Sequence, residues 1–106
     1  MSVQEFLRCS GILSGIAEFE QTENALLLDV RTPQEYREGH IPGSRNLPLQ
    51  AIENAVSLIK NKEAKLFVYC HCGERSGEAA RTLRGMGYSN VKSIGGIAAY
   101  GGALAR

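Results

Sequence analysis

The sequence has no tryptophan, only three prolines and only three cysteines among its 106 residues. Because an odd number of cysteines without a secretion signal argues against a disulfide framework, we expect three reduced thiols. No apolar stretch approaches the roughly 20 residues that a membrane-spanning helix needs. These scarcities therefore predict neither a set of structural disulfides nor a membrane partner.

Clustered charge of one sign is also missing. Lys and Arg total 12 and Asp and Glu total 11, so the net charge is +1, and no basic run points to a nucleic-acid partner. The N-terminal segment carries Glu5, Arg8, Glu18 and Glu20 and has no compact apolar stretch before a cleavage site. We therefore predict no signal peptide and a cytoplasmic location. The length suits one domain over residues 1–106, which we expect to be a monomer.

Strand-like and helical patterns alternate along the chain. Strands are predicted at Ala25–Val30, Ser44–Leu47, Lys65–Cys70 and Val91–Ile94. Apolar spacing predicts helices over 14–21, 49–59 and 76–86, after an amphipathic start at 3–9. Thr32 and Glu35 form a capping-box pattern around Pro33, which predicts a short helix that Gly39 ends. This order predicts a three-layer α/β/α sandwich with a mainly parallel sheet.

The segment from Cys70 to Ser76 lies where a predicted strand meets a predicted helix. Ligands of parallel sheets bind beyond the carboxyl ends of the strands, and helix N-termini offer N–H groups and partial positive charge. A thiol held there is expected to be accessible and to react as a thiolate, with the N–H groups of residues 71 to 76 forming an anion-binding nest. Gly73 would supply a backbone conformation that residues with side chains rarely adopt. Arg75 would bind an oxyanion with two N–H groups. Ser76 would be a helix cap and a further hydrogen-bond donor to the sulfur.

Several short motifs follow one another through most of the chain. They are Leu28-Asp29-Val30-Arg31, Glu35-Tyr36, Gly39-His40-Ile41-Pro42-Gly43-Ser44, Asn46-Leu47-Pro48, Val68-Tyr69-Cys70 with Gly73, Arg75 and Ser76, and Gly85-Met86-Gly87-Tyr88 with Val91 and Gly95-Gly96-Ile97. Together, in this order, they resemble the single-domain rhodanese family of sulfurtransferases. The resemblance implies a rhodanese-like fold with a five-stranded, mainly parallel sheet.

The resemblance also implies a reaction. Cys70 would be the catalytic cysteine that takes a sulfane sulfur from a donor such as thiosulfate, becomes a persulfide, and passes the sulfur to cyanide or a thiol. The substrate-binding loop would be His71, Cys72, Gly73, Glu74, Arg75 and Ser76. No metal or organic cofactor is expected, because the sulfur is carried covalently and one Cys-x-Cys without a second pair is poor metal spacing.

Other functions remain alternatives at this point. Phosphatases of similar architecture need five residues between cysteine and arginine, whereas four separate Cys70 from Arg75, so a sulfur-sized cradle is favoured. A non-catalytic rhodanese-like binding module typically lacks the cysteine that this chain keeps. A third alternative is a persulfide or redox relay, in which Cys70 and Cys72 work together with a sulfur-relay protein.

Individual residues carry further expectations. Cys72 is interpreted as a neutral, solvent-facing residue, although a relay thiol or a strained disulfide with Cys70 stays open. Glu74 would repel thiosulfate if it faced the entrance. Cys9, remote from every motif, is expected to be a small buried apolar residue.

Charged and polar residues outside the loop are interpreted as non-catalytic. Asp29 and Arg31 are interpreted as a buried or half-buried ion pair that holds the loops, since buried charges need partners. His40 is expected to be a hydrogen-bonded packing residue, and Glu35 is interpreted, with Arg37, as part of a solvated helix face.

Overall fold

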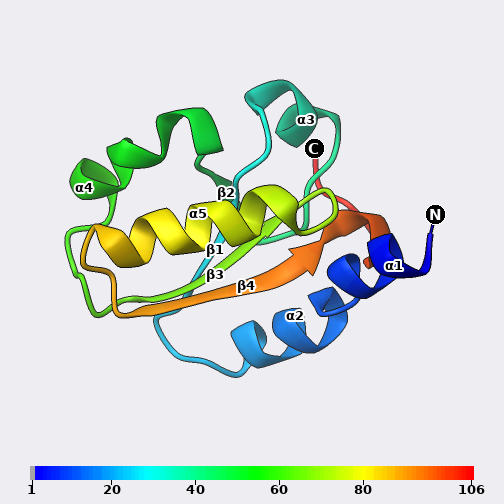
Figure 1. The fold of residues 1–106 in the computed structure, drawn as a ribbon, viewed down its shortest axis with the longest axis horizontal. Helices are drawn as coiled ribbons and strands as arrows, with labels where there is room; N and C mark the ends of the chain where they lie inside the picture. Colours follow the sequence, from blue (N-terminus) through cyan, green and yellow to red (C-terminus); the bar gives the residue numbers. More distant parts are fainter. Residues whose placement is uncertain (1) are drawn as a thin grey trace.

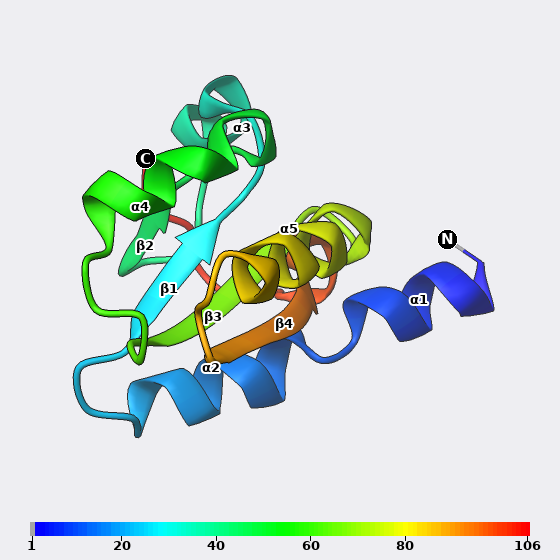
Figure 2. The same cartoon turned by 60° about the vertical axis from the view of Figure 1, so that its left-hand side comes forward.

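A parallel sheet between two layers of helices forms the body of the molecule (Figures 1 and 2). The structure is a computed structural model that describes residues 2–106, apart from the side chains at positions 5, 6 and 8. The strands are β1 (Leu26–Asp29), β2 (Ser44–Asn46), β3 (Lys65–Cys70) and β4 (Asn90–Gly96). Their order in the sheet is β2-β1-β3-β4, and every neighbouring pair is parallel.

Helices connect the strands and cover both faces of the sheet. They are α1 (Val3–Cys9), α2 (Ile12–Glu20), α3 (Pro33–Glu38), α4 (Ala55–Leu58) and α5 (Glu74–Gly85), with 3-10 turns η1 (Leu49–Asn54) and η2 (Ile97–Ala99). In Figure 1, α2 lies below the sheet, whereas α3, α4 and α5 lie above it. The three-layer α/β/α prediction is therefore confirmed.

The sheet has one strand fewer than the family resemblance implied. Within residues 2–106 it contains four strands, so the expectation of five is wrong. These four strands correspond to the four segments that the apolar pattern predicted, and residues 3 to 20 before β1 fold mainly as the helices α1 and α2. The helix predicted over 49–59 is split, because non-helical backbone at Ala51 interrupts η1 before α4 begins.

Two apolar clusters pack on opposite faces of the sheet. The first joins β1 and β3 to α4, α5 and η1, and includes Leu28, Val68, Leu83 and Tyr88. The second joins the other face to α2 and includes Ile12, Leu27, Phe67 and Ile94. Because β1 and β3 bury side chains on both faces, their apolar runs are continuous, as the parallel-strand pattern predicted.

An irregularity in β4 shapes the carboxyl end of the sheet. Val68 pairs with Ser93, but Cys70 pairs with Gly96, so β4 carries one extra residue in this interval. Gly95 has a φ of 103°, a conformation that glycine adopts most readily. Such bulges bend a strand and change where its neighbours lie. This one aligns Gly96 with Cys70 at the end of β3.

Candidate active site

Cys70 ends β3, where the predicted strand meets the predicted helix. It is 1% exposed, so the expectation of good access to this thiol is wrong for this conformation of the loop. The Gly73 N–H donates to Cys70 Sγ over 2.9 Å, and the thiol donates to Ser76 Oγ over 3.6 Å. Cys70 is the free thiol among the residues that the structure describes. The sulfur therefore lies under the loop that follows it.

The loop itself is very short because α5 begins at Glu74. Gly73 is the residue before the helix, with a φ of 101°, so the prediction that it adopts a left-handed conformation is confirmed. This conformation turns its N–H toward Cys70 Sγ. One N–H donor of the predicted anion-binding nest is thus in place.

Ser76 has a different position from the one expected. It lies inside the first turn of α5 and is not the helix cap. Its hydroxyl is buried and is within hydrogen-bond distance of the Gly73 carbonyl at 3.1 Å and of Ser93 Oγ at 2.9 Å. In this arrangement Ser76 accepts a hydrogen bond from the Cys70 thiol, whereas it was expected to donate one, and it connects the sulfur to the bulged part of β4.

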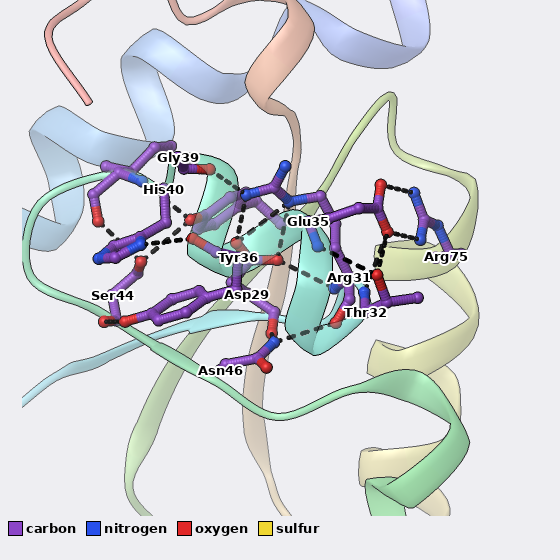
Figure 3. Close-up of polar contacts among 12 residues, drawn as sticks. Asp29, Arg31, Thr32, Glu35, Tyr36, Gly39, His40, Ser44, Asn46 and Arg75 are labelled. Carbon is purple, nitrogen blue, oxygen red and sulfur yellow. Dashed lines mark hydrogen bonds and ion pairs between the residues drawn. The ribbon is translucent and has the colours of Figure 1, made fainter. Parts of the chain in front are cut away.

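Arg75 forms an ion pair with Glu35, a carboxylate that was expected to be solvated. Its two terminal nitrogens donate to Glu35 over 2.7 and 3.1 Å, as Figure 3 shows. Glu35 also accepts from the Thr32 N–H and hydroxyl at the start of α3. The solvated-face interpretation of Glu35 is therefore wrong, and Arg75 ties α5 to α3 with the N–H groups that were expected to bind an oxyanion.

The ion pair changes the acidity of Glu35. Hydrogen bonding from Arg75 lowers the pKa of Glu35 from 4.5 to about 2, against the opposing effect of burial. A lowered pKa in the folded state means that protonation favours unfolding. The stabilisation is present above pH 4.5, the ordinary value, and is lost as the pH falls from there towards about 2.

This effect can be measured with Glu35→Gln. We expect the difference in unfolding free energy between the wild type and Glu35→Gln to shrink as the pH falls from 4.5 towards about 2, because the lost charge matters only while Glu35 is ionised. Urea unfolding at a series of pH values gives this difference. Glu38→Gln is the matched control, since Glu38 is exposed on the same helix. If the difference in unfolding free energy stayed constant across this pH range, the lowered pKa assigned to Glu35 would be wrong.

Asp29 and Arg31 form the buried ion pair that was predicted. Arg31 Nη2 lies 2.7 Å from Asp29 Oδ2, and Arg31 also donates to the Gly39 carbonyl (Figure 3). Asn46 donates to the main-chain carbonyls of Asp29 and Arg31. This network fixes the carboxyl end of β1 and the loop that leads to α3.

His40 also has its predicted structural role. Its ring stacks on Tyr36 with centroids 3.7 Å apart, and Nδ1 lies 2.8 Å from the Tyr36 carbonyl oxygen (Figure 3). The backbone of His40 pairs with Ala105, which fastens the C-terminal segment beside α3. His40 therefore organises the surroundings of the site.

Cys72 is joined to Cys9 by a disulfide, with a sequence separation of 63 and Cα atoms 4.6 Å apart. The expectation of three reduced thiols is therefore wrong for this structure. The expectation that Cys9 is buried is confirmed, although it is bonded to the predicted loop, whereas the interpretation of Cys72 as a neutral, solvent-facing residue is wrong. The reason is tertiary: α1 packs against β4 and η2, next to the loop after Cys70. The cytoplasmic location stays a prediction.

The remaining loop residues pack closely against the end of the sheet. The His71 side chain is exposed, but its carbonyl accepts the Ala98 N–H over 3.0 Å. A Cβ on Gly96 would lie 2.1 Å from that His71 oxygen and 2.5 Å from Cys72 Cα, so glycine is required here. Glu74 is exposed in the first turn of α5. Its predicted influence on thiosulfate stays a prediction.

A cavity of about 280 Å³ opens beside the loop. It is lined by Arg31, Glu35, Glu38, Gly39, His71, Ile97, Ala98 and Leu104. Cys70 is not among these residues. A ligand seated in this cavity therefore reaches the sulfur only after the loop moves.

Residues 16–103 match the family model described as a rhodanese-like domain. The chain belongs to this family. It is 37% identical over 71 residues to the thiosulfate sulfurtransferase PspE of Escherichia coli, covering 66% of this chain and 68% of that protein. It is 38% identical over 78 residues to the thiosulfate sulfurtransferase GlpE of Pseudomonas entomophila, covering 72% of this chain and 69% of that protein.

A solved structure agrees with this assignment. The human single-domain sulfurtransferase TSTD1 superposes with a TM-score of 0.73 at 25% identity, covering 83% of this chain and 90% of that one. Within residues 2–106, no helix is both long and apolar enough to cross a bilayer. The described side chains also include no group of three or more His, Cys, Asp or Glu that could hold a metal ion.

Three residues of the site were missed by sequence reasoning. Cys9 gave no signal, because nothing local links it to a residue 63 positions away. Glu35 was recognised only as part of a capping box, and that pattern does not show which cation lies across from it. Gly96 was noted only as part of the Gly95-Gly96-Ile97 motif, although its closeness to the sulfur loop explains why it is glycine.

Proposed function

We propose that the chain is a sulfurtransferase that carries a sulfane sulfur as a persulfide on Cys70. The observation that carries the proposal is the Gly73 N–H directed at Cys70 Sγ over 2.9 Å, at the carboxyl end of a central parallel strand. A donor in this position stabilises an anionic sulfur. The named thiosulfate sulfurtransferases among the relatives support the same chemistry.

The proposed reaction has two steps. The Cys70 thiolate attacks the outer sulfur of thiosulfate, the S–S bond of the donor breaks, and sulfite leaves with the electron pair. Cyanide or a thiolate then attacks the outer sulfur of the persulfide, and the Cys70 thiolate leaves. The Gly73 N–H stabilises the sulfur anion at both stages, because a charge-assisted hydrogen bond is stronger than a neutral one.

Arg75 takes an indirect part in this proposal. Its guanidinium is engaged by Glu35, so its contribution to donor binding is a general positive charge next to the loop. The Glu35 carboxylate raises the pKa of Arg75 above its usual value, so this charge is permanent. Holding α5 against α3 also fixes the N-terminal turn of α5, which follows Gly73 directly.

Mass spectrometry tests the proposal directly. After incubation with thiosulfate and removal of excess donor, we expect the intact protein to gain the mass of one sulfur atom. Peptide mapping should locate that atom on Cys70. Addition of cyanide should return the original mass and release thiocyanate. Loading is to be measured both with the disulfide intact and after its reduction, because Cys70 is buried beneath the loop.

The same measurement separates the alternative functions. A dithiol relay between Cys70 and Cys72 predicts a loss of two hydrogens with a new bond between these cysteines, in place of stable sulfur loading. That alternative requires Cys72 first to leave its bond with Cys9. A binding module predicts no mass change under any condition.

A phosphatase is disfavoured by the loop and its arginine. Three residues separate β3 from α5, and Arg75 is already held in two hydrogen bonds by a carboxylate. A phosphate group would need several unengaged donors around it. If the protein hydrolysed an aryl phosphate and took up no sulfur, a phosphatase function would be favoured over a sulfurtransferase function.

A further inference from the structure

The disulfide links the first helix to the loop that covers Cys70. Cys9 is the last residue of α1, and Cys72 lies two residues after Cys70. Cys9 is completely buried, whereas Cys72 is partly exposed. Attack on a disulfide needs access to one of its sulfurs. Because Cys72 is the more exposed cysteine of the pair, we take Cys72 Sγ as the atom that an incoming thiolate attacks.

The loop is held over Cys70 by one covalent and two non-covalent constraints. The disulfide is the covalent one. The others are the hydrogen bond from Ala98 to the His71 carbonyl and the close packing of Gly96 against Cys72. Beneath them Cys70 is only 1% exposed. A donor of several atoms can reach the sulfur only if this loop moves outward.

The same bond joins α1 to the loop. With seven residues, α1 is shorter than the roughly 12 residues that an isolated helix needs to be even marginally stable. Of its described side chains, Val3, Gln4 and Leu7 are exposed, and Cys9 is buried. Cleavage of the disulfide therefore removes the covalent link between this short helix and the loop.

We propose that the Cys9–Cys72 disulfide is a redox latch on the sulfur loop, and that a dithiol opens it by thiol–disulfide exchange at Cys72. With the bond intact, the loop stays closed over Cys70. With the bond reduced, the loop opens often enough for a sulfur donor to reach Cys70. This inference rests on the proposed function for its consequence, but the latch itself is measurable without any sulfur donor.

The exchange is balanced by the dithiol alone. One thiolate of the dithiol attacks Cys72 Sγ, the bond to Cys9 breaks, and Cys9 leaves as a thiolate that takes up a proton. The second thiolate of the reductant then attacks the reductant's first sulfur, which is bonded to Cys72 in the mixed disulfide. The bond to Cys72 breaks, and Cys72 leaves as a thiolate. Two electrons and two protons pass from the dithiol to the protein, and the dithiol becomes a disulfide.

The test compares oxidised and reduced full-length protein. Dithiothreitol reduces the sample and is removed without air, because residual dithiol would strip a persulfide. Iodoacetamide is then added, and peptide mapping follows alkylation of Cys70. A parallel sample receives thiosulfate, and sulfur on Cys70 is followed over time. We expect both rates to rise by about tenfold or more on reduction, as local opening becomes easier.

Cys9→Ala is the matched variant. It removes the bond at a buried position with a small apolar side chain, so its Cys70 is expected to react at the fast rate before and after dithiothreitol. Cys72→Ser removes the same bond from the other end, and agreement between the two variants excludes a local effect of either substitution. Circular dichroism confirms that each variant keeps its fold.

The alkylation and sulfur-loading results test the redox latch separately from the proposed sulfurtransferase function. Equal Cys70 alkylation in oxidised and reduced wild type, or faster alkylation of the oxidised protein, would overturn the latch. Sulfur loading at one rate in both states would overturn it too, while leaving the sulfurtransferase proposal standing. Alkylation that responds to reduction, with no sulfur on Cys70 in either state, would support the latch and defeat the proposed function.

Discussion

Cys70→Ser is expected to bring thiocyanate formation from thiosulfate and cyanide down to the rate without protein. The substitution replaces the atom that accepts and releases sulfur in the proposed reaction, and a serine hydroxyl forms no persulfide. Because Cys70 is buried and its sulfur accepts from Gly73, serine keeps the size and a hydrogen-bonding atom at that place. The loss therefore concerns chemistry, since the fold around the site is retained. The measurement is thiocyanate released per protein per unit time.

Cys9→Ala is the control for this experiment, because it replaces another completely buried cysteine. It is expected to keep transfer, at a rate equal to or above that of the oxidised wild type. Matching thermal unfolding curves for Cys70→Ser and the wild type would show that the fold is intact. Undiminished thiocyanate formation by Cys70→Ser would remove Cys70 from the mechanism and leave Cys72 as the thiol to examine.

Features set by neighbouring residues were predictable from the sequence. Thr32, Pro33 and Glu35 form a capping box in the structure, with Thr32 accepting from the Glu35 N–H. Strand β3 has the bounds that its apolar run predicted, and α5 follows it almost at once. Such features depend on residues within one or two turns of each other, and local patterns describe them well.

Features that join distant segments were not predictable from the sequence. The partner of Arg75 lies 40 residues earlier, and the partner of Cys72 lies 63 residues earlier. Both pairs form only when helices from different parts of the chain meet at the carboxyl end of the sheet. Two residues of the predicted loop therefore have partners other than those expected: Arg75 binds a carboxylate of α3, and Cys72 binds the cysteine that ends α1.

The burial of Cys70 changes how the loop is understood. The sequence suggested an accessible thiol at the N-terminal end of a helix, whereas the sulfur is enclosed by Gly73, Ser76 and the loop above it. In the proposed reaction, enclosure would protect a persulfide from stray nucleophiles, but each donor and acceptor would need an opening step. The proposed redox latch acts on that opening step, because the disulfide is attached to this loop.

Asp29→Asn is expected to lower the free energy of unfolding by about 3–5 kcal/mol, the range found when one partner of a buried ion pair is removed. Asp29 is completely buried, and Arg31 is 6% exposed. The carboxylate accepts the Arg31 N–H, Nε and Nη2 groups over 2.7 to 3.1 Å. Asparagine has the same shape but leaves the guanidinium buried without a counter-charge. Urea denaturation followed by circular dichroism measures the loss.

Glu18→Gln is the matched control, because it makes the same change of carboxylate to amide in a pair that water surrounds. Glu18 and Lys92 have side chains that are 50% and 57% exposed, and such pairs contribute little to stability. We expect this variant to unfold at nearly the wild-type urea concentration. Similar midpoints for the two variants would contradict a dominant role for the Asp29–Arg31 pair. The cost of Asp29→Asn should also persist in high salt, since ions screen exposed pairs far more than buried ones.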